Sequence, residues 1–476
     1  MKTLTFRSHI DVPAEALFAW HARPGAFERL TPPWAPVEMV QFEGIRDGNR
    51  AVIHLGPGPA SLTWIAEHRD YIEGRQFRDV QIKGPFKSWT HTHRMEPDGP
   101  DASYLVDHIE YDLPFGPLGD VADVQARKEL ERQFAYRHRI TQQDLAAHQR
   151  YGGRPLRVAI SGASGLLGSK LAAFLSTGGH EVLRLVRRSP AAPSEVYWNW
   201  RKGRIERDKL EGLDAVIHLA GENVFALRWT EAKKRKIYAS RVGGTAFLSE
   251  TLAALNQPPR ALLSASAIGI YGDQGRERLT ETSEVAERGF LAAVCRDWEQ
   301  ATGPASEAGI RTAHLRIGVV LSPEGGALRW MLPAFQLGLG ATIGDGKRYF
   351  PWSAIDDVVQ GIYHVLHAES LSGPVNFTSP RPATMEAFVQ TLARVLGRPA
   401  FLRLPAELAR LAGGEIADEM LLKSARVLPE RLETSGYDVL YPSLEDALRH
   451  QLGKTVAWPP RIAVPAQSPV PDLSEQ

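Results

Sequence analysis

The sequence predicts a doubly wound α/β sheet preceded by a smaller α+β segment. From residue 156 onward, short apolar runs alternate with helical patterns, and a glycine-rich turn follows the first run. Before residue 150, short strand-like runs lie between turn signals instead. Apolar runs separated by helices are typical of parallel strands covered on both faces. We therefore expect a parallel sheet with helices on both sides, following an antiparallel sheet.

Length and composition limit the classes of protein to which the chain can belong. The chain has 476 residues, enough for two to four domains at about 100–200 residues each. Its 56 Lys+Arg against 55 Asp+Glu leave a net charge of +1, which argues against a chain-wide interface with nucleic acid or anionic lipid. The single cysteine, Cys295, excludes an intrachain disulfide and any multi-cysteine metal site.

We expect neither a signal peptide nor a membrane span. The opening MKTLTFRSHIDVP carries charge early and has no apolar core like that of a signal peptide. No stretch approaches about 18 uninterrupted apolar residues, so we expect no membrane span. A reducing compartment fits the cysteine usage, and we expect a cytoplasmic protein whose oligomeric state the sequence leaves open.

The first segment predicts strands and two helices. Leu4, Phe6 and Ile10 share one parity, as a half-buried strand requires. A helix follows, with Asp11 as a cap and Pro13 in its first turn. Further strands are predicted at 51–55, 61–65, 76–82, 88–94 and 104–111.

A long polar helix ends this segment. Ala126, Leu130 and Phe134 lie four residues apart on one of its faces. The glycine-bearing stretch 151–155 then predicts a domain boundary. The expected organisation is an α+β domain at 1–150, a doubly wound domain at 156–400, a helical piece at 401–455 and an extended or disordered tail at 456–476.

The glycine-rich turn predicts nucleotide binding. Gly162, Gly165 and Gly168 form G-x-x-G-x-x-G between a strand at 157–161 and an amphipathic helix. Glycines let backbone N–H groups approach a pyrophosphate, and the helix N-terminus adds its positive end. The last glycine allows helix and strand to pack closely. The alternative is a glycine-rich turn that binds nothing.

The second strand of this domain indicates which dinucleotide binds. NAD sites place Asp or Glu about 20 residues past the glycines, to hold the ribose 2′-hydroxyl. Arg187 and Arg188 stand there instead, and a guanidinium can hold a 2′-phosphate in a bidentate manner. We therefore expect NADP(H) in preference to NAD(H). The alternative is that both arginines are merely solvated.

Residues 156–455 resemble the atypical extended short-chain dehydrogenase/reductases, an NAD-dependent epimerase-like group with a specialised C-terminal domain. The matching stretches are SGASGLLG, DAVIHLAGEN with SRVGGT, SASAIGIYGD, LRIGVVLSPEGGAL and LPAFQLGLGATIGDGKRYFPWSAIDD, followed by LPERL, GYD and PSLEDAL. The resemblance implies a Rossmann domain that binds a nicotinamide dinucleotide and a small terminal domain.

Residues 1–150 resemble the polyketide-cyclase/START-like superfamily, whose helix-grip fold wraps a curved sheet around a long helix. The matching pieces are DVPAEALFAW, LTPPW, GPFKSWTHTH and YLVDHIEYDLPFG. The resemblance implies an enclosed cavity for an apolar ligand, and the alternative is a filled core. Trp20, Trp34, Trp64 and Trp89 would line the cavity or belong to that core.

The resemblance also exposes a departure from the usual chemistry. Ordinary members use a Tyr and a Lys four residues later as acid and base. When Glu299 is set against the family's acidic residue, Leu291 takes the Tyr position and Cys295 the Lys position. Ser266 lies near the position of the substrate-holding Ser, so it is our catalytic candidate, with Ser264 as the other. Both hydroxyls could instead simply close a strand end.

The glycine pattern and the resemblance together define the expected cofactor residues. These are Gly162, Ser164, Gly165, Leu166, Leu167, Gly168, Arg187, Arg188, Leu219, Ala220, Gly221, Glu222 and Ser264. Glu222 is unusual beside a phosphate-rich ligand. We expect it to meet a ribose hydroxyl or a basic group such as Arg228 or Arg241, and a plain salt bridge is the alternative.

Three other groups of residues give weaker signals. Asp356 and Asp357 are expected to cap a helix beginning at Val358. The loop at 344–352 supplies plausible substrate-pocket residues, Trp352 among them. His91 and His93 share a strand face but have no third ligand near in sequence, so we expect no metal.

Two hypotheses for function follow. The first is an NADP(H)-binding epimerase-like oxidoreductase whose small-molecule substrate is unknown. The second is a protein that senses NADP(H) with little or no catalysis, because the Tyr/Lys pair is absent. The sequence shows no sugar-nucleotide pocket signature.

Overall fold

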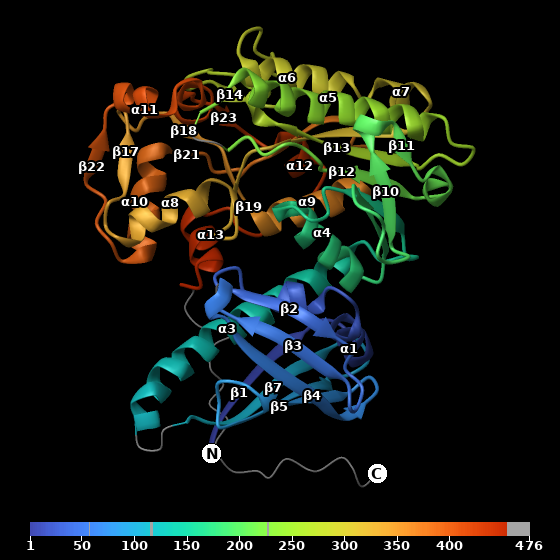
Figure 1. The fold of residues 1–476 in the computed structure, drawn as a ribbon, viewed down its shortest axis with the longest axis vertical. Coiled ribbons are helices and arrows are strands. Elements are labelled where there is room, and N and C mark those ends of the chain that lie inside the picture. The colour runs from blue at the N-terminus through green and yellow to red at the C-terminus, as the bar shows by residue number, and fades with distance from the viewer. Residues whose placement is uncertain (57, 115–117, 226–227, 455–476) are drawn as a thin grey trace. The chain divides into compact units, whose positions relative to one another are not determined.

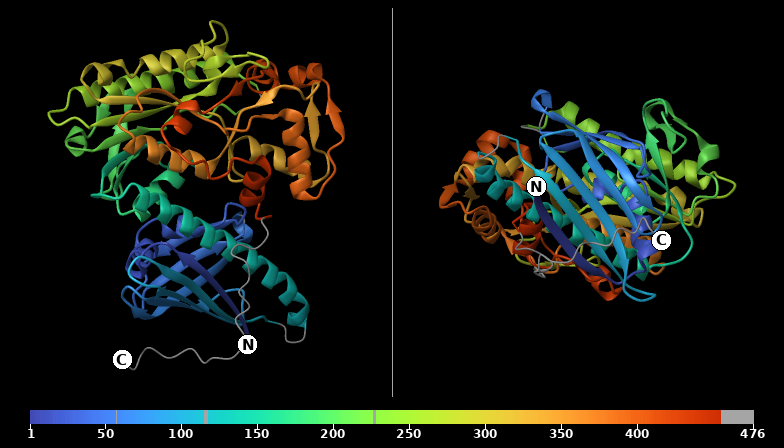
Figure 2. Two further views of the ribbon diagram at one scale, coloured as in Figure 1. Left: turned by 180° about the vertical axis from the view of Figure 1, so that it is seen from behind. Right: turned by 90° about the horizontal axis from the view of Figure 1, so that it is seen from below.

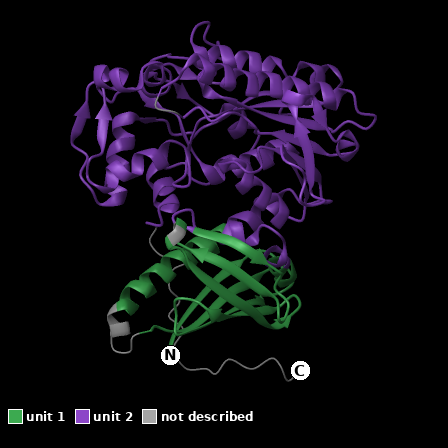
Figure 3. Ribbon diagram, viewed as in Figure 1, with its two compact units in different colours: residues 1–18, 37–142, 455–476 green, residues 19–36, 143–454 purple. Residues whose placement is uncertain are grey.

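The computed structural model describes residues 1–56, 58–114, 118–225 and 228–454. They form two compact units (Figure 3), which we call unit 1 and unit 2. Unit 1 contains residues 1–18 and 37–142, and unit 2 contains residues 19–36 and 143–454. The tail expected at 456–476 lies outside the described residues, and the expected domain boundaries stay predictions.

Unit 1 is built on a seven-stranded antiparallel sheet with the order β1-β7-β6-β5-β4-β3-β2. Its strands are β1 (Lys2–Ile10), β2 (Val37–Phe42), β3 (Arg50–Leu55), β4 (Leu62–Ile72), β5 (Gln76–Lys83), β6 (Ser88–Pro97) and β7 (Ser103–Asp112). All the strands predicted in this segment are confirmed. The strand that the sequence reading missed, β2, is a mostly exposed edge strand and lacks a clear apolar alternation.

The long predicted helix is α3 (Leu118–Arg150), and its part up to residue 142 belongs to unit 1. Leu130 and Phe134 pack against Trp89, Ile109 and other buried residues of the sheet. Figure 2 shows the curved antiparallel strands in blue, as in a helix-grip fold. Helix α1 (Ala14–Ala22) begins in unit 1 and ends in unit 2.

The tryptophans divide between the units. Trp64 and Trp89 lie in unit 1, edge to face at 5.2 Å between ring centroids, and both pack on Phe86. Trp20 and Trp34 fall in the segment that belongs to unit 2. Whether any of the four tryptophans lines a cavity stays a prediction.

Unit 2 contains an eight-stranded sheet with the order β11-β10-β9-β8-β12-β13-β15-β20, parallel except for β11. Its strands are β8 (Arg157–Ser161), β9 (Glu181–Val186), β10 (Glu195–Asn199), β11 (Arg204–Ile205), β12 (Ala215–His218), β13 (Ala261–Ala267), β15 (Arg311–Ile317) and β20 (Gly373–Phe377). All the predicted apolar runs are strands here. The strand order reverses at β8, where such sheets bind ligands.

Helices cover both faces of this sheet (Figure 1). One face carries α4 (Leu166–Thr177) and α9 (Ile355–His367), and their apolar residues form one core with the sheet. The other face carries α5 (Glu231–Ala253), α6 (Phe290–Gln300) and α7 (Gly303–Glu307). The doubly wound architecture expected from the sequence is confirmed.

The remaining elements of unit 2 are short strand pairs and helices. The strands are β14 (Arg278–Leu279), β16 (Val319–Leu321), β17 (Ala341–Ile343), β18 (Tyr349–Phe350), β19 (Trp352–Ala354), β21 (Ala383–Thr384), β22 (Leu402–Leu404) and β23 (Arg426–Val427). The helices are α2 (Ala26–Leu30), α8 (Gly326–Gln336), α10 (Met385–Leu396), α11 (Ala406–Gly413), α12 (Glu430–Thr434) and α13 (Leu444–Gln451). No described helix is long and apolar enough to cross a membrane.

Asp356 does not cap a helix, contrary to expectation. Helix α9 starts at Ile355, so Asp356 lies inside its first turn and is buried. Its Oδ1 lies 3.3 Å from Arg29 Nη1, and Arg29 also makes two hydrogen bonds of 2.7 Å with Asp144. Asp356 is held by a buried guanidinium rather than by backbone N–H groups.

Asp357, the second residue expected to cap, also lies in the first turn of α9. Its Oδ1 accepts the backbone N–H of Leu440 at 2.6 Å, and its Oδ2 accepts that of Tyr441 at 3.1 Å. Tyr437 donates its hydroxyl to Oδ1 at 3.3 Å. The carboxylate therefore satisfies donors of a distant loop rather than those of its own helix.

His148, near the C-terminal end of α3, is half-buried, and both nitrogens of its ring are buried without hydrogen bonds. Its ring lies 4.4 Å from that of Phe174, and neither ring nitrogen has a hydrogen-bond partner among the described residues. Burial lowers the pKa of His148 to about 3. The folded state therefore holds this ring neutral.

Acid should destabilise unit 2 through His148. In the unfolded chain a histidine has a pKa of about 6.5, so the stabilisation is complete above that pH and lost as pH falls toward 3. The variant His148→Leu should flatten this decline by a few kcal/mol, measured by urea unfolding at pH 7 and pH 4. The exposed control His9→Leu should keep the wild-type profile. Parallel profiles for His148→Leu and wild type would contradict the prediction.

Candidate functional site

The glycine turn lies between β8 and α4, as predicted. Gly162 adopts a φ of +74°, which favours glycine. Gly165 donates its N–H to the carbonyl of Gly162 at 2.9 Å and is the N-cap of α4. The first N–H groups of a helix have no partner within it, so the start of α4 offers donors and a positive dipole end to an anion.

Two of the three glycines are required by close backbone packing. A Cβ on Gly168 would lie 2.8 Å from the carbonyl carbon of Gly162 and still closer to its oxygen. A Cβ on Gly162 would lie 2.9 Å from the backbone of Leu219 and Ala220. The turn is therefore pressed against its own helix and against the end of the neighbouring strand β12.

A buried pair of side chains holds the two strand ends together. Ser161 Oγ accepts the backbone N–H groups of Leu219 and Ala220, each at 3.2 Å. The Ser161 hydroxyl also lies 2.6 Å from His218 Nδ1. Burial lowers the pKa of His218 to about 4, which keeps the ring neutral and able to accept that bond. The structure thus brings the predicted 219–221 turn beside the glycine turn.

The other predicted residues of this turn differ in exposure. Ser164 and Gly165 are exposed, Leu166 and Leu167 are half-buried, and Gly168 is buried. Leu167 packs against the core below α4. A ligand would therefore meet the exposed backbone of the turn rather than its apolar side chains.

The two arginines after β9 have different environments. Arg188 makes two hydrogen bonds with the carboxylate of Glu195, at 2.8 and 2.5 Å. Arg187 is exposed and has no hydrogen bond or ion pair among the described residues. Of the two predicted arginines, only Arg187 keeps its guanidinium unoccupied by protein groups.

Glu222 forms the salt bridge that the sequence left as one alternative. Its Oε1 lies 2.7 Å from Lys233 Nζ, and that bond lowers the pKa of its carboxyl group. Arg241 donates to the backbone carbonyl of Glu222 at 2.9 Å rather than to its carboxylate. Arg228 instead donates to the carbonyl of Leu411 at 2.7 Å.

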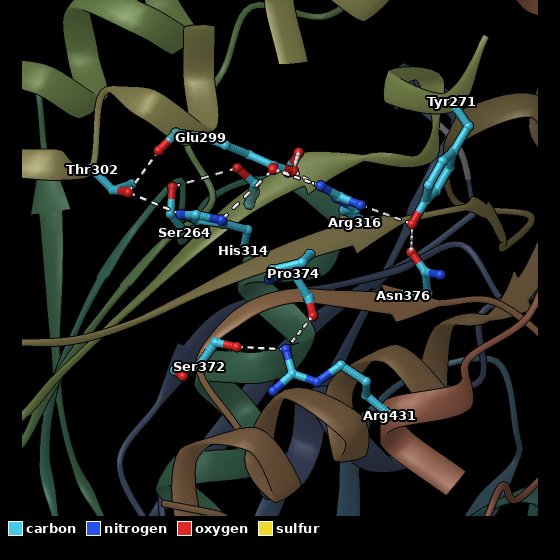
Figure 4. A network of polar contacts seen from close by, with 12 residues as sticks. Ser264, Tyr271, Glu299, Thr302, His314, Arg316, Ser372, Pro374, Asn376 and Arg431 are labelled. Atoms are coloured by element: carbon cyan, nitrogen blue, oxygen red, sulfur yellow. Dashed lines mark hydrogen bonds and ion pairs between the residues drawn. The ribbon is translucent and has the colours of Figure 1, made fainter. Parts of the chain in front are cut away.

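A continuous polar network crosses the carboxyl ends of β13, β15 and β20 (Figure 4). Ser266 donates its hydroxyl to Glu299 Oε1 at 2.7 Å. Glu299 accepts two hydrogen bonds from Arg316, at 2.8 and 2.9 Å. Arg316 also donates to the Tyr271 hydroxyl at 2.9 Å, and that hydroxyl donates to Asn376 Oδ1 at 2.8 Å.

This network occupies the groups that catalysis would need. Ser266 is only 3% exposed and its hydroxyl is bound to Glu299. Burial raises the pKa of Tyr271, which the network holds as a neutral phenol. Ser264 is buried as well, and its hydroxyl is 3.4 Å from the carbonyl of Ala265. The catalytic role of Ser266 and the cofactor role of Ser264 stay predictions.

Helix α6 carries the residues at the usual Tyr and Lys positions. Cys295 is buried, and burial raises the pKa of its thiol to about 12, so it is not a proton donor at neutral pH. Leu291 is half-buried and packs near Gly269.

In the sequence, Glu299 served only to align this helix with the family's acidic residue. Its spacing from Ala292 and Cys295 placed it on the buried face of α6, which was a signal that it has a partner inside.

The loop at 344–352 supplies fewer pocket residues than expected. Trp352 is buried in a core with Phe388 and other apolar residues, so it does not line a pocket. Arg348 donates to the carbonyl of Ile343 at 3.2 Å. Lys347 is exposed and stays a candidate.

Family comparisons match three parts of the chain. Residues 158–376 match a family described as NAD dependent epimerase/dehydratase, and residues 404–451 match a domain of unknown function. Residues 10–135 match the family described as polyketide cyclase / dehydrase and lipid transport. Both resemblances drawn from the sequence motifs are confirmed.

Individual relatives cover the same regions. An epimerase family protein of Mycobacterium tuberculosis is 42% identical over 291 residues, which are 61% of this chain and 96% of that protein. The structure of a nucleoside-diphosphate sugar epimerase from Corynebacterium glutamicum is 35% identical, with a TM-score of 0.79 over 96% of this chain and 91% of that one. The structure of human epimerase family protein SDR39U1 with NADPH is 32% identical, with a TM-score of 0.58 over 62% and 99%.

The close packing of Gly168 predicts a selective loss of dinucleotide binding. Gly168→Ala pushes a methyl group into the Gly162 carbonyl, so the turn must open. We expect the affinity for NADPH to fall roughly tenfold or more, about 1.4 kcal/mol, measured by calorimetry. Gly303→Ala is the matched control, because its Cβ would find its nearest neighbour 4.0 Å away. Equal affinities for the two variants would contradict the role of the turn.

Proposed function

Since the chain belongs to the NAD dependent epimerase/dehydratase family, we propose that it binds NADP(H) and transfers hydride to or from a small molecule. The observation that carries the proposal is the glycine turn at the point where the strand order reverses. There, Gly162 and Gly168 bring backbone donors and the N-terminus of α4 to one edge of the sheet. That arrangement suits a pyrophosphate.

The preference for NADP(H) rests on the end of β9. No carboxylate follows this strand directly, and the exposed guanidinium of Arg187 is available for a 2′-phosphate. Arg188 is engaged by Glu195, so we assign the phosphate contact to Arg187 alone. The human relative crystallised with NADPH supports this choice of dinucleotide.

Calorimetric titration of the purified chain with NADPH and, separately, with NADH tests the proposal. We expect NADPH to bind more tightly than NADH. If neither binds, the glycine turn has no nucleotide and the proposal fails. Equal affinities would leave dinucleotide binding in place and remove the preference.

A second function, sensing of NADP(H) without turnover, is favoured by one observation. The usual Tyr and Lys positions hold Leu291 and Cys295, and the Ser266 hydroxyl is bound to Glu299. An enzyme should change the nicotinamide absorbance when given carbonyl or hydroxyl compounds. A sensor should bind without turnover and shift its affinity for a second ligand by a reciprocal factor.

We further propose that unit 1 binds an apolar ligand. The match of residues 10–135 to a family that includes lipid transport supports this role. The side chains of Phe6, Phe77 and Trp89 are packed against other residues of unit 1, so the proposal rests on the family match. Binding of a fluorescent fatty acid, competed by unlabelled apolar compounds, would test it.

A charge reversal at Arg187 separates the two dinucleotides. Arg187→Asp puts a carboxylate where the 2′-phosphate is expected, so NADPH should bind roughly tenfold or more weakly, about 1.4 kcal/mol. NADH, which lacks that phosphate, should change little. Arg276→Asp makes the same charge change at another exposed arginine and should alter neither affinity. Equal losses for NADPH and NADH would refute the assignment to Arg187.

A further inference from the structure

A polar cluster lies between the sheet and helix α3 in unit 1. Asp79 comes from β5, His91 and His93 from β6, Asp107 from β7 and His138 from α3. The strand register places Asp79 opposite His91 and His93 opposite Asp107. The sequence showed only the two histidines of β6, because Asp79 and Asp107 lie on the neighbouring strands.

Three of these residues turn one atom each toward a common point. Asp79 Oδ1 lies 3.3 Å from His91 Nδ1 and 3.2 Å from His93 Nε2. All three ligand atoms lie within 4.8 Å of one another. In a tetrahedral zinc site with bonds of about 2.0–2.1 Å, ligand atoms lie about 3.3–3.4 Å apart. The two measured separations fall close to that value.

The opposite ring nitrogens are held by one carboxylate. Asp107 Oδ1 lies 2.9 Å from His91 Nε2 and 2.8 Å from His93 Nδ1. Its Oδ2 lies 2.7 Å from His138 Nε2, whose other nitrogen is 2.7 Å from Ser8 Oγ. Metal-binding histidines characteristically donate their second N–H to a carboxylate, which fixes the ring and its tautomer. Asp107 stands where it orients both rings at once.

The surroundings of the cluster are apolar on one side and reach solvent on the other. The His93 ring stacks on Phe77 at 4.2 Å, and His91 lies 5.1 Å from Phe134. The side chain of Asp79 is 18% exposed and that of His93 is 11% exposed, whereas that of Asp107 is only 4% exposed. An ion could enter from the side of Asp79, and the supporting carboxylate stays buried.

We propose that Asp79, His91 and His93 bind one divalent transition-metal ion, Zn²⁺ or Fe²⁺, with Asp107 positioning the two histidines. Two histidines and one carboxylate leave further coordination positions open, and such sets occur at catalytic zinc and non-haem iron centres. The expectation of no metal rested on the lack of a third ligand near in sequence, and the fold supplies one in Asp79.

The competing arrangement is a metal-free pair of imidazolium ions between two carboxylates. Although burial alone would lower it, the charges of Asp79 and Asp107 raise the pKa of His91 to about 9. In that case each ring carries two protons and no ion binds. Metal titration separates the two arrangements directly, because only one of them leaves a nitrogen lone pair on each ring.

The test begins with the full chain, stripped by chelator and dialysed. Zn²⁺ and Fe²⁺ are titrated by calorimetry, the latter without oxygen, and Co²⁺ by its visible absorption. We expect one equivalent of metal to bind and a Co²⁺ spectrum of nitrogen and oxygen ligands. Absence of stoichiometric binding by all three ions would overturn the proposal.

Variants locate the ion. Asp79→Asn and His93→Gln should abolish stoichiometric binding, and Asp107→Asn should weaken it by about 10–100-fold through loss of ring orientation. His108→Gln is the control, because His108 lies on β7 beside Asp107 but bonds to Thr5 instead. Unchanged binding by Asp79→Asn and His93→Gln would overturn the assignment.

A spectroscopic measurement on the wild type tests the site even where the variants fail to fold. X-ray absorption of the Zn²⁺-loaded chain should show two imidazoles with oxygen ligands. A sulfur ligand, which only Cys295 or a methionine could give, would contradict the site, and so would fewer than two imidazoles.

Discussion

The buried charges of Arg29, Asp144 and Asp356 constrain the rest of unit 2. Arg29 is 1% exposed, and Asp144 and Asp356 are also buried. Removal of one partner from such a group costs about 3–5 kcal/mol, because the others stay buried and unpaired. The group joins α2 and α3 to α9, and α9 shares a core with α4. The helix that begins at the glycine turn therefore packs on a layer that an arginine far upstream helps to fix. The proposed cofactor site thus depends on residues outside the doubly wound segment.

The carboxyl ends of β13, β15 and β20 in unit 2 present a different constraint. Ser266, Glu299, Arg316 and Tyr271 form a closed network, in which each polar group satisfies another. A charge that is already neutralised gives little extra stabilisation to a developing negative charge on a substrate. Under the proposed function, hydride transfer then depends on the positioning of the nicotinamide. The proton, however, would have to come from the substrate, from water or from a side chain outside the network, since Leu291 and Cys295 supply none.

Local sequence patterns predicted most of the fold. The features that they missed depend on contacts between residues that lie far apart in the chain. Alternation and apolar runs predicted β1, β3 to β9, β12, β13 and β15, and missed the edge strand β2 together with β10, β11 and β20. The glycine turn was predicted because its spacing and flanking elements are contiguous in the chain. Asp356 was expected to cap α9 by a local rule, but Arg29, 327 residues away in sequence, holds it instead. Asp79 was missed for the same reason, because its partners are set by strand register rather than by neighbouring positions.

The polar networks around Arg316 and around Asp79 differ in a way that bears on function. Polar groups in a core cost free energy unless they are satisfied, and apolar replacements of buried ion pairs are often at least as stable. The network around Arg316 is satisfied by protein groups, so a structural role is sufficient to explain it. The groups of the cluster around Asp79 also have protein partners, but two imidazoles and a carboxylate converge there on one point beside a partly exposed Asp79. Two oriented rings, one supporting carboxylate and a partly exposed side also match the arrangement of a metal site. A bound cation gives the same residues a common partner.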